Sequence, residues 1–382
     1  MGIAYNLVPD APLGGSPLLA GLVVIVGFLL GLRLCHRVRR RRQGERVLVL
    51  GSSPLGRQIV EEIERRTDLR YQVVGVVDDA ENLDRVIETT LPDRIVVALA
   101  ERRGRLPVYP LLESRARGIV VEDAAATYER LTGKLALEAM SPSSIVFSAD
   151  FQVSRPHLAL SRALSLLVSV VGLIVLAPVF VLIVLLIKLD SRGPVFFIQE
   201  RVGLSGLSFR LVKFRTMHPA GRSQSEWEQD NCDRITRVGK WLRRFRLDEL
   251  PQLVNVLRGD MNLVGPRPHP VTNLGLLILV VRNLSDVSGD AIPYYSLRCA
   301  VRPGITGWAQ IRYGYANTIE EEMEKLRYDF YYLKHMSFWL DLRILFETAR
   351  IVWTGHSSAA AAARVGRPDG SVDWTRRSGR VA

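Results

Sequence analysis

The sequence predicts a membrane-associated α/β protein, and three features support that class. Two long apolar segments, residues 17–32 and 163–187, are bordered by basic residues. Between them, residues 45–125 alternate short apolar runs with amphipathic stretches, as in parallel strands joined by helices. Residues 189–354 are dense in Arg, Pro and Gly. We therefore expect an N-terminal membrane helix, a Rossmann-like parallel-sheet domain, a second membrane-embedded helix and an α-rich domain.

The composition narrows the classes of partner. The 382 residues have room for two or three domains, and the formal net charge of +12 favours an anionic partner. Anionic lipid and phosphorylated substrates fit that charge, whereas no recognition-helix pattern favours nucleic acid. The three cysteines, Cys35, Cys232 and Cys299, are far apart and form no CxxC pair. Neither a disulfide framework nor a zinc site is indicated.

The first apolar segment, PLLAGLVVIVGFLLGL at 17–32, carries no charge and is followed by RLCHRVRRRRQ. A cleaved signal peptide carries its basic residues before the apolar core, so the order here favours a spanning anchor. The arginine cluster places the C-terminal side in the cytoplasm. We assign residues 1–44 to this anchor and its basic cytoplasmic flank.

The second apolar segment, residues 163–187, lies between Arg162 and Lys188 and contains Pro178 near its middle. Spanning would place Arg-rich regions on opposite membrane faces, against the usual charge distribution. Because proline bends a helix, a helix that enters, turns at Pro178 and leaves by the same face fits both observations. A proline-kinked spanning helix is the alternative.

The region between the membrane segments is predicted to form a Rossmann-like domain with a linker over residues 45–150. Strands are expected at four apolar runs, which are residues 46–51, 71–79, 94–100 and 118–123. Gly51, Gly56 and Asp78 match positions of a dinucleotide-binding turn, but Ser53 replaces its middle glycine. We therefore favour a structural or regulatory domain over a redox site.

The stretch RRFRLDELPQLVNVLRGDMNLVGPRP, residues 243–268, contains two adjacent acids, Asp248 and Glu249. Apolar residues recur at helical spacing after them, so Asp248 is expected at a helix start, a favoured capping position; these residues are Leu250, Leu253, Val254 and Leu257. The surrounding cations favour a different role. Guanidinium groups bind phosphate oxygens, and carboxylates can hold Mg²⁺ or attack phosphorus. The predicted phosphate-binding cations are Arg201, Lys213, Arg215, Arg243 and Arg267.

Several runs in the second half together resemble the bacterial sugar transferases of the monotopic polyprenyl-phosphate phosphoglycosyl transferase family. They follow the family's order and are SRGPVFFIQERVG (191–203), FRLVKFRTM (209–217), RFRLDELPQLVNVLRGDMNLVGPRP (244–268), VRPGITGWAQIRYGYA (301–316) and KLRYDFYYLKHMSFWLDLRILFETARIV (325–352). The resemblance implies transfer of a phosphosugar from a UDP-sugar to undecaprenyl phosphate, with Mg²⁺. It also implies a re-entrant helix broken at a proline.

Carried over by position, the resemblance makes Asp248 the nucleophile and Glu249 its partner in metal binding or proton handling. It assigns Arg243 and Arg267 to substrate phosphates. Members often have Asn-Gly-Arg after Trp-Ala-Gln, and here Arg312 is the candidate substitute, as in an exopolysaccharide subgroup. The implied location is the inner membrane, with the catalytic domain, residues 151–354, facing the cytoplasm.

Two other functions remain open from the residues alone. The Rossmann-like domain would make the protein a nucleotide-dependent oxidoreductase or sugar-modifying enzyme if it held the working site. A non-enzymatic basic membrane scaffold would also account for the charge. The sequence leaves open the sugar, the polyprenyl length and the choice between monomer and homodimer. Residues 355–382 lack apolar periodicity and are expected to be a disordered tail.

Overall fold

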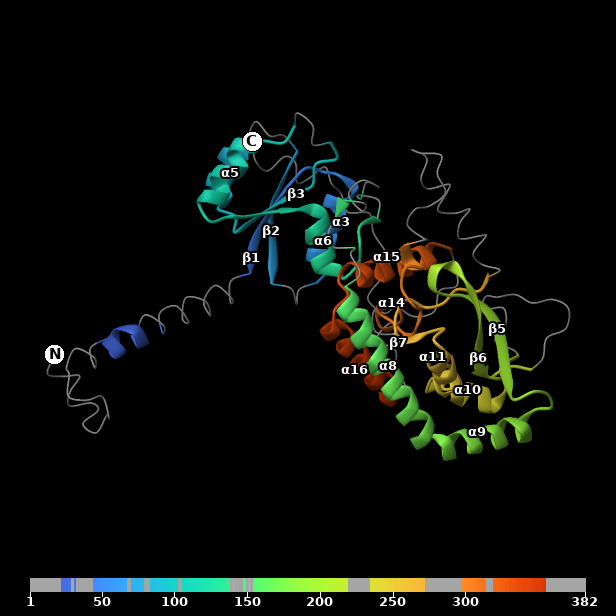
Figure 1. Ribbon diagram of the computed structural model, residues 1–382. Helices are drawn as coiled ribbons and strands as arrows, with labels where there is room; N and C mark the ends of the chain where they lie inside the picture. The colour runs from blue at the N-terminus through green and yellow to red at the C-terminus, as the bar shows by residue number, and fades with distance from the viewer. Residues whose placement is uncertain are drawn as a thin grey trace, which may run out of the picture. The chain divides into compact units, whose positions relative to one another are not determined.

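The computed structural model describes residues 22–28, 31, 44–66, 70–78, 83–101, 105–137, 140, 147–148, 151, 154–218, 234–271, 297–313 and 319–354. They divide into two compact units, the first ending at Thr132 and the second beginning at Gly133 (Figure 1). Residues 22–28 of the predicted anchor are helical, and the rest of that anchor, apart from residue 31, lies outside the described residues, as does the predicted tail.

The first unit contains the predicted parallel sheet. Its strand order is β2(Tyr71–Val77), β1(Glu45–Leu50), β3(Arg94–Val97) and β4(Val120–Asp123), and all neighbours are parallel. The central strands consist of apolar side chains, since an internal parallel strand is buried on both faces. Leu48, Leu50 and Ile95 are fully buried. The alternation of strands and helices read from the sequence is therefore confirmed.

Helices cover both faces of this sheet (Figure 1). Leu83 and Val86 of α4(Leu83–Thr90), with Leu111 of α5(Val108–Ala116), pack on one face. Helices α3(Pro54–Arg65) and α6(Ala124–Thr132) pack together on the other. Ile59 and Ile63 of α3 are buried at helical spacing and account for its position.

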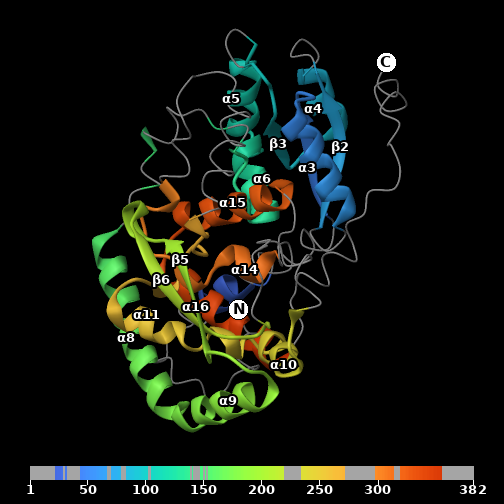
Figure 2. The same ribbon diagram turned by 90° about the vertical axis from the view of Figure 1, so that its right-hand side faces the viewer.

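The apolar segment of the second unit is two helices rather than one. Helix α8(Arg155–Val175) ends at Leu176, and α9(Ala177–Asp190) starts with Pro178 in its first turn. The two helices meet at a pronounced bend (Figures 1 and 2). Among the described residues, α8 alone is long and apolar enough to cross a bilayer, judged by length and composition. The break falls at the proline, as the sequence predicts.

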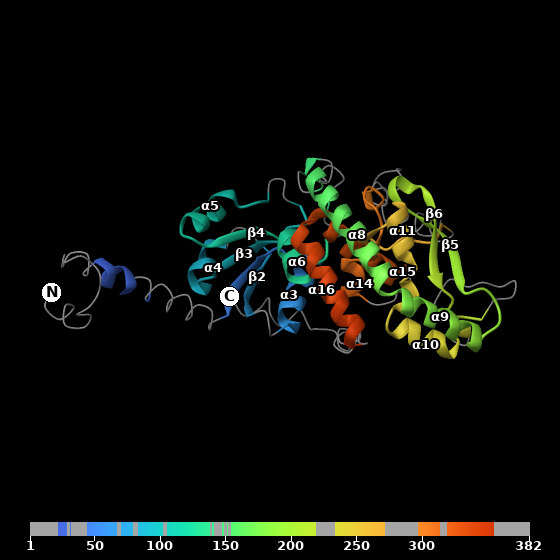
Figure 3. The same ribbon diagram turned by 60° about the horizontal axis from the view of Figure 1, so that its bottom comes forward.

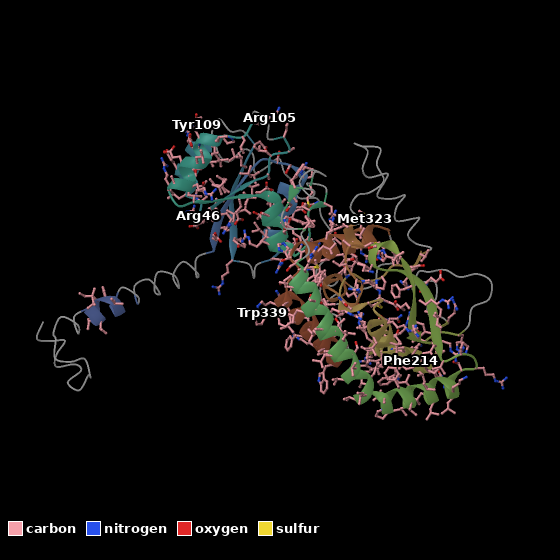
Figure 4. All side chains as sticks on the ribbon, in the orientation of Figure 1. Arg46, Arg105, Tyr109, Phe214, Met323 and Trp339 are labelled. Atoms are coloured by element: carbon pink, nitrogen blue, oxygen red, sulfur yellow. The ribbon has the colours of Figure 1, made fainter. Side chains whose placement is uncertain are left out.

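A two-stranded hairpin follows α9. Strands β5(Phe196–Val202) and β6(Ser208–Phe214) are antiparallel and joined by a 3-10 turn at Leu204–Gly206. The ring of Phe214, labelled in Figure 4, lies 5.4 Å from Phe180 of α9 and 5.5 Å from Phe196 between ring centroids. These aromatic contacts fasten the hairpin to the second apolar helix.

The remaining helices accompany a short parallel strand pair, and Figure 3 shows these helices beside α8 and α9. This pair is β7(Asn262–Val264) with β8(Gly304–Thr306). The helices that accompany it are α10(Arg237–Arg244), α11(Gln252–Arg258), α14(Trp308–Arg312), α15(Ile319–Lys334) and α16(Phe338–Thr354).

The second unit begins at Gly133, before residue 151, where the sequence predicts the start of the catalytic domain. The sequence predicts that residues 133–150 belong to the first domain and its linker. In the structure, the Trp308 indole N–H donates to the Gly133 carbonyl at 2.9 Å, and the Leu135 amide donates to the Arg327 carbonyl at 3.0 Å. Leu135 is fully buried beside Phe330 of α15. The chain therefore joins the second unit immediately after α6.

Candidate active site

The acid pair lies on a backbone turn between two helices. Helix α10 ends at Arg244, and Arg246 then adopts the left-handed region with φ 53°. A 3-10 turn at Leu247–Glu249 carries Asp248 and Glu249, and α11 begins only at Gln252. The expectation that Asp248 caps the following helix is wrong, because Pro251 occupies that position and no side-chain cap is made. The acid pair is thus not explained by helix capping.

The face that α11 buries also differs from the expected one. Leu257 is 38% exposed, whereas Val256 is fully buried. The Asn255 amide donates to the Arg210 carbonyl at 2.7 Å, and its oxygen accepts from the Val212 amide at 3.1 Å. Asn255, which is fully buried, fixes the helix to β6. This bond places β6, with Lys213, beside the acid pair.

Glu249 is held by two guanidinium groups. Its carboxylate lies 3.3 Å from Arg267 Nη1 and 3.8 Å from Arg246 Nη1. Burial pushes the pKa of Glu249 upward, but the charges of Arg267, Arg246 and Lys213 outweigh burial, and the pKa lies below its usual value. Glu249 is therefore ionised and fixed in orientation.

Asp248 is buried like Glu249 but is not held. Asp248 is 8% exposed, and among the residues that the structure describes none donates a hydrogen bond to its carboxylate. Burial, followed by the neighbouring charge of Glu249, raises the pKa of Asp248 to about 6, against the opposing charges of Lys213, Arg243 and Arg267. Asp248 is thus a desolvated carboxylate whose oxygens are available for chemistry.

Lys213 completes the charged ring around the pair. Burial, together with the charge of Arg201, lowers the pKa of Lys213 to about 8, while Asp248 opposes the shift. Its ammonium lies 5.0 Å from the centroid of the Phe197 ring. Lys213, Arg243 and Arg267 therefore lie close enough to the acids to act on their pKa values, and their role in phosphate binding stays a prediction.

Three other predicted cations have different surroundings. Arg215 is buried and donates to the carbonyls of Ser191 and Arg192 at 2.8 and 3.1 Å, which secures the turn after α9. Arg201 donates to the Pro268 carbonyl at 2.9 Å. Arg312 lies over the Trp308 ring, 4.4 Å from its centroid. Their predicted roles in substrate binding stay predictions.

In the first unit, the turn that contains Gly51 and Gly56 packs closely against neighbouring backbone and caps the helix that follows it. A Cβ at Gly51, where φ is 103°, would lie 2.6 Å from the Ala98 carbonyl oxygen. The Gly56 amide donates to Ser53 Oγ at 3.2 Å. Asp78 is exposed after β2. Backbone packing and helix capping thus account for Gly51 and Gly56, and this geometry does not favour a bound pyrophosphate.

Several charged residues near the site were not anticipated. Arg298 and Asp329 form a buried ion pair at 2.8 Å, and His269 Nε2 lies 3.4 Å from Glu322. Burial, followed by the charge of Arg298, lowers the pKa of His269 to about 4. The signal in the sequence was the spacing of Glu322 and Asp329, which occupy one face of a helix at i and i+7.

The carboxylate set fits a divalent metal that the substrate completes. Within the described ranges, no group of three His, Cys, Asp or Glu side chains forms a closed metal site. Asp248 and Glu249 supply two adjacent carboxylates close to the cations Lys213, Arg243 and Arg267, and Mg²⁺ is commonly bound by one or two carboxylates plus substrate phosphates. The donor set therefore fits Mg²⁺ bound together with a diphosphate.

Residues 156–355, slightly more than half of the chain, match the bacterial sugar transferase family along their length. The chain belongs to this family. The match includes α8, the hairpin, the acid pair and α16, so the site described above lies wholly within the sugar transferase region.

Relatives of this sugar transferase differ in how much of their length it matches. A UDP-N-acetylgalactosamine-undecaprenyl-phosphate N-acetylgalactosaminephosphotransferase of Aeromonas hydrophila is 39% identical over 228 residues, 59% of this chain and 51% of that protein. A UDP-glucose:undecaprenyl-phosphate glucose-1-phosphate transferase of Escherichia coli is 32% identical over 334 residues, which are 82% of this chain and 68% of that protein. The exopolysaccharide production protein PSS of Rhizobium leguminosarum is 40% identical over 195 residues, which are 50% of this chain and 94% of that protein. The chain thus spans about half the length of the Aeromonas relative.

Proposed function

We propose that this chain transfers a phosphosugar from a UDP-sugar to undecaprenyl phosphate, through a covalent intermediate on Asp248. The observation that carries the proposal is a buried, unfixed carboxylate beside a fixed one, inside a ring of Lys213, Arg243 and Arg267. The names of the relatives, which pair a UDP-sugar with undecaprenyl phosphate, support the substrate classes.

In the first step, an Asp248 oxygen attacks the β-phosphorus of the UDP-sugar. The bond from that phosphorus to the bridging oxygen breaks, and UMP leaves with the electron pair. In the second step, a phosphate oxygen of undecaprenyl phosphate attacks the same phosphorus, and the Asp248 carboxylate is released. The product is an undecaprenyl diphosphate-linked sugar, and the two steps predict ping-pong kinetics.

The charged ring has a clear task in this scheme. A carboxylate that approaches a diphosphate is repelled, and the cations around Asp248 offset that repulsion. Arg267 and Arg246 keep Glu249 ionised and oriented. Bound by Asp248 and Glu249 with the substrate phosphates, Mg²⁺ would supply further charge neutralisation. Lys213, Arg243 and Arg267 are expected to hold phosphate oxygens during both steps.

We also propose that the reaction occurs at the cytoplasmic face of the inner membrane and initiates exopolysaccharide assembly. Leu167 and Ile174 of α8 are 63% and 69% exposed, and Val181 and Leu185 of α9 are 61% and 55% exposed. Exposed apolar side chains on two neighbouring helices are typical of a surface that contacts lipid or another apolar partner. The bend between these helices supports a re-entrant arrangement, with both ends of the segment on one face.

The decisive experiment replaces Asp248 and measures UMP release. Purified protein in detergent is incubated with undecaprenyl phosphate and a panel of UDP-glucose, UDP-galactose and UDP-N-acetylhexosamines. Asp248→Asn is expected to abolish UMP release and radiolabelled phosphosugar on the enzyme. Asp84→Asn, at an exposed residue of α4, is the control and should retain both. Full activity of Asp248→Asn would refute the proposal.

A further inference from the structure

The segment that carries Arg267, residues 265–270, is held at four successive carbonyls; we call it the PRP loop. The Pro266 carbonyl accepts from the Gly304 amide at 2.9 Å, and the His269 carbonyl accepts from the Val202 amide at 2.9 Å. The other two carbonyls accept from side chains, at Arg267 from Arg298 and at Pro268 from Arg201. The loop is therefore fastened to β8, to β5 and to residue 298.

Carbonyls are the main backbone groups available for this fastening. Residues 266, 268 and 270 are prolines, which have no N–H, and proline also restricts φ. A loop of this composition has few conformations to lose, and bonds at its carbonyls select one of them. The direction of the Arg267 side chain thus depends on bonds that reach the loop from outside.

Arg298 makes the bond to the carbonyl of Arg267 itself, the residue whose guanidinium contacts Glu249. Its Nη2 donates to the Arg267 carbonyl at 2.5 Å, and its Nε donates to Asp329 at 2.8 Å. Arg298 is 5% exposed and Asp329 is 2% exposed. A guanidinium can serve two acceptors at once in a fixed geometry, which an ammonium on a flexible stem cannot reproduce.

Helix α15 supports the loop at a second point. Glu322, seven residues before Asp329 and on the same helix face, faces His269 at 3.4 Å. The opposite end of the chain of contacts is Arg267 Nη1, which lies 3.3 Å from Glu249. A continuous set of contacts thus runs from α15, through Arg298 and the PRP loop, to the acid pair.

We propose that Arg298, anchored by Asp329, is a positioning residue that holds the PRP loop so that the Arg267 guanidinium stays against Glu249. Arg298 donates to the backbone of Arg267 and, among the described contacts, to neither Asp248 nor Glu249. It therefore acts on the acid pair through Arg267. The consequence for turnover rests on the proposed function, whereas the consequence for the loop does not.

The loop is tested by hydrogen–deuterium exchange of the full-length protein in detergent. Arg298→Lys retains the positive charge opposite Asp329 but removes the planar guanidinium that donates to both Asp329 and the Arg267 carbonyl. It is expected to speed exchange of the Val202 and Gly304 amides, whose acceptors are loop carbonyls, by about 10-fold. Arg327→Lys is the matched control, because Arg327 pairs with Glu324 on the same helix at 2.9 Å. Unchanged exchange in Arg298→Lys would overturn the proposal.

Turnover is tested with a double-mutant cycle on UMP release. Arg298→Lys is expected to lower kcat/KM about 10- to 100-fold in the wild-type background, but less than about threefold in Arg267→Ala. An equal loss in both backgrounds would show that Arg298 does not act through Arg267. If Arg298→Lys fails to fold, Asp329→Asn replaces it in both measurements with the same expected directions.

The two experiments separate the two proposals. A wild-type protein that releases no UMP from any UDP-sugar contradicts the proposed function, and amide exchange then decides the role of Arg298 alone. A wild-type protein that is active, with Arg298→Lys altering neither exchange nor turnover, contradicts the positioning role and leaves the proposed function standing.

Discussion

At the scale of single residues, two neighbouring carboxylates differ in whether other side chains hold them in place. Glu249 is fixed by Arg267 and Arg246, whereas Asp248 is buried without a donor among the described residues. Their pKa values are displaced in opposite directions for that reason. Environments that separate the pKa values of paired acids are typical of sites that assign them different roles.

The raised pKa of Asp248 predicts the acid limb of the pH profile. The nucleophile must be deprotonated, so kcat/KM for UMP release should fall as the pH drops through about 6. Arg267→Ala removes a charge that lowers this pKa, so the midpoint should move to higher pH. Initial rates between pH 5 and 8 measure both effects, with Arg117→Ala, at an exposed residue of the first unit, as the control. A flat profile would contradict the assignment of Asp248.

The sequence predicted those features of this site that depend on the residue types within short motifs. The acid pair and the cations Lys213, Arg243 and Arg267 were predicted and are found together. The hydrogen bonds of Arg215 to Ser191 and of Arg298 to the Arg267 carbonyl were not predicted. Those partners are backbone carbonyls brought near by tertiary packing, and residue type does not mark them.

At the scale of elements, strands β7 and β8 approach so closely that glycine is required. A Cβ at Gly304 would lie 2.1 Å from the Gly265 amide nitrogen, and a Cβ at Gly307 would lie 2.2 Å from the Gly265 carbonyl oxygen. The backbone contacts of Gly304 and Gly307 with Gly265 thus set the start of the PRP loop.

Gly304→Ala is therefore expected to destabilise the second unit by more than about 3 kcal/mol, because backbone atoms cannot yield as side chains do. The midpoint of thermal unfolding in detergent measures the effect. Gly172→Ala is the control, since its nearest neighbour is the flexible Leu253 Cδ1 at 3.3 Å. A midpoint equal to that of the control would show that the strands can separate at little cost.

Helix α8 extends beyond the apolar segment that marks it in the sequence. The prediction began at residue 163, and the helix begins at Arg155. Its first turns carry polar side chains with tertiary partners, because Arg162 donates to the Met261 carbonyl at 2.9 Å and Ser165 accepts from the Leu263 amide at 3.1 Å. A hydropathy pattern does not identify polar helical residues whose side chains form hydrogen bonds with neighbouring parts of the protein.

The bend between α8 and α9 predicts the side on which the chain continues. A re-entrant segment returns residues 189–354 to the face from which α8 departed, so a reporter fused to the C-terminus should give a cytoplasmic signal. The same reporter inserted before residue 154 should give the same signal. Signals from opposite sides would instead establish a kinked helix that spans the bilayer.

At the scale of the whole molecule, the chain divides into two compact units, and we expect the sugar transferase region to function without the parallel-sheet unit. The Rhizobium relative aligns over 94% of its length with half of this chain. The first unit has its own buried core around Leu48 and Leu50, and its glycine turn is filled by Ala98 and Ser53. The parallel strands of that unit were predictable from alternating patterns, whereas their order was not predicted and the boundary of the unit depended on contacts made by Gly133 and Leu135.

Deleting residues 45–132 is therefore expected to leave UMP release within about threefold of the full chain, since compact domains of this size fold separately. The comparison requires equal amounts of membrane-extracted protein, and Asp248→Asn in the shortened chain is the control for background. A complete loss of activity with the second unit still folded would assign the parallel-sheet unit a part in the reaction.

The left-handed backbone at Arg246 has a consequence for engineering. A non-glycine residue in that conformation stores local strain, and glycine there would relieve it while removing a charge from Glu249. Selection of variant libraries for heat resistance alone would therefore enrich substitutions of Arg246, and the selected variants would be more stable but slower catalysts.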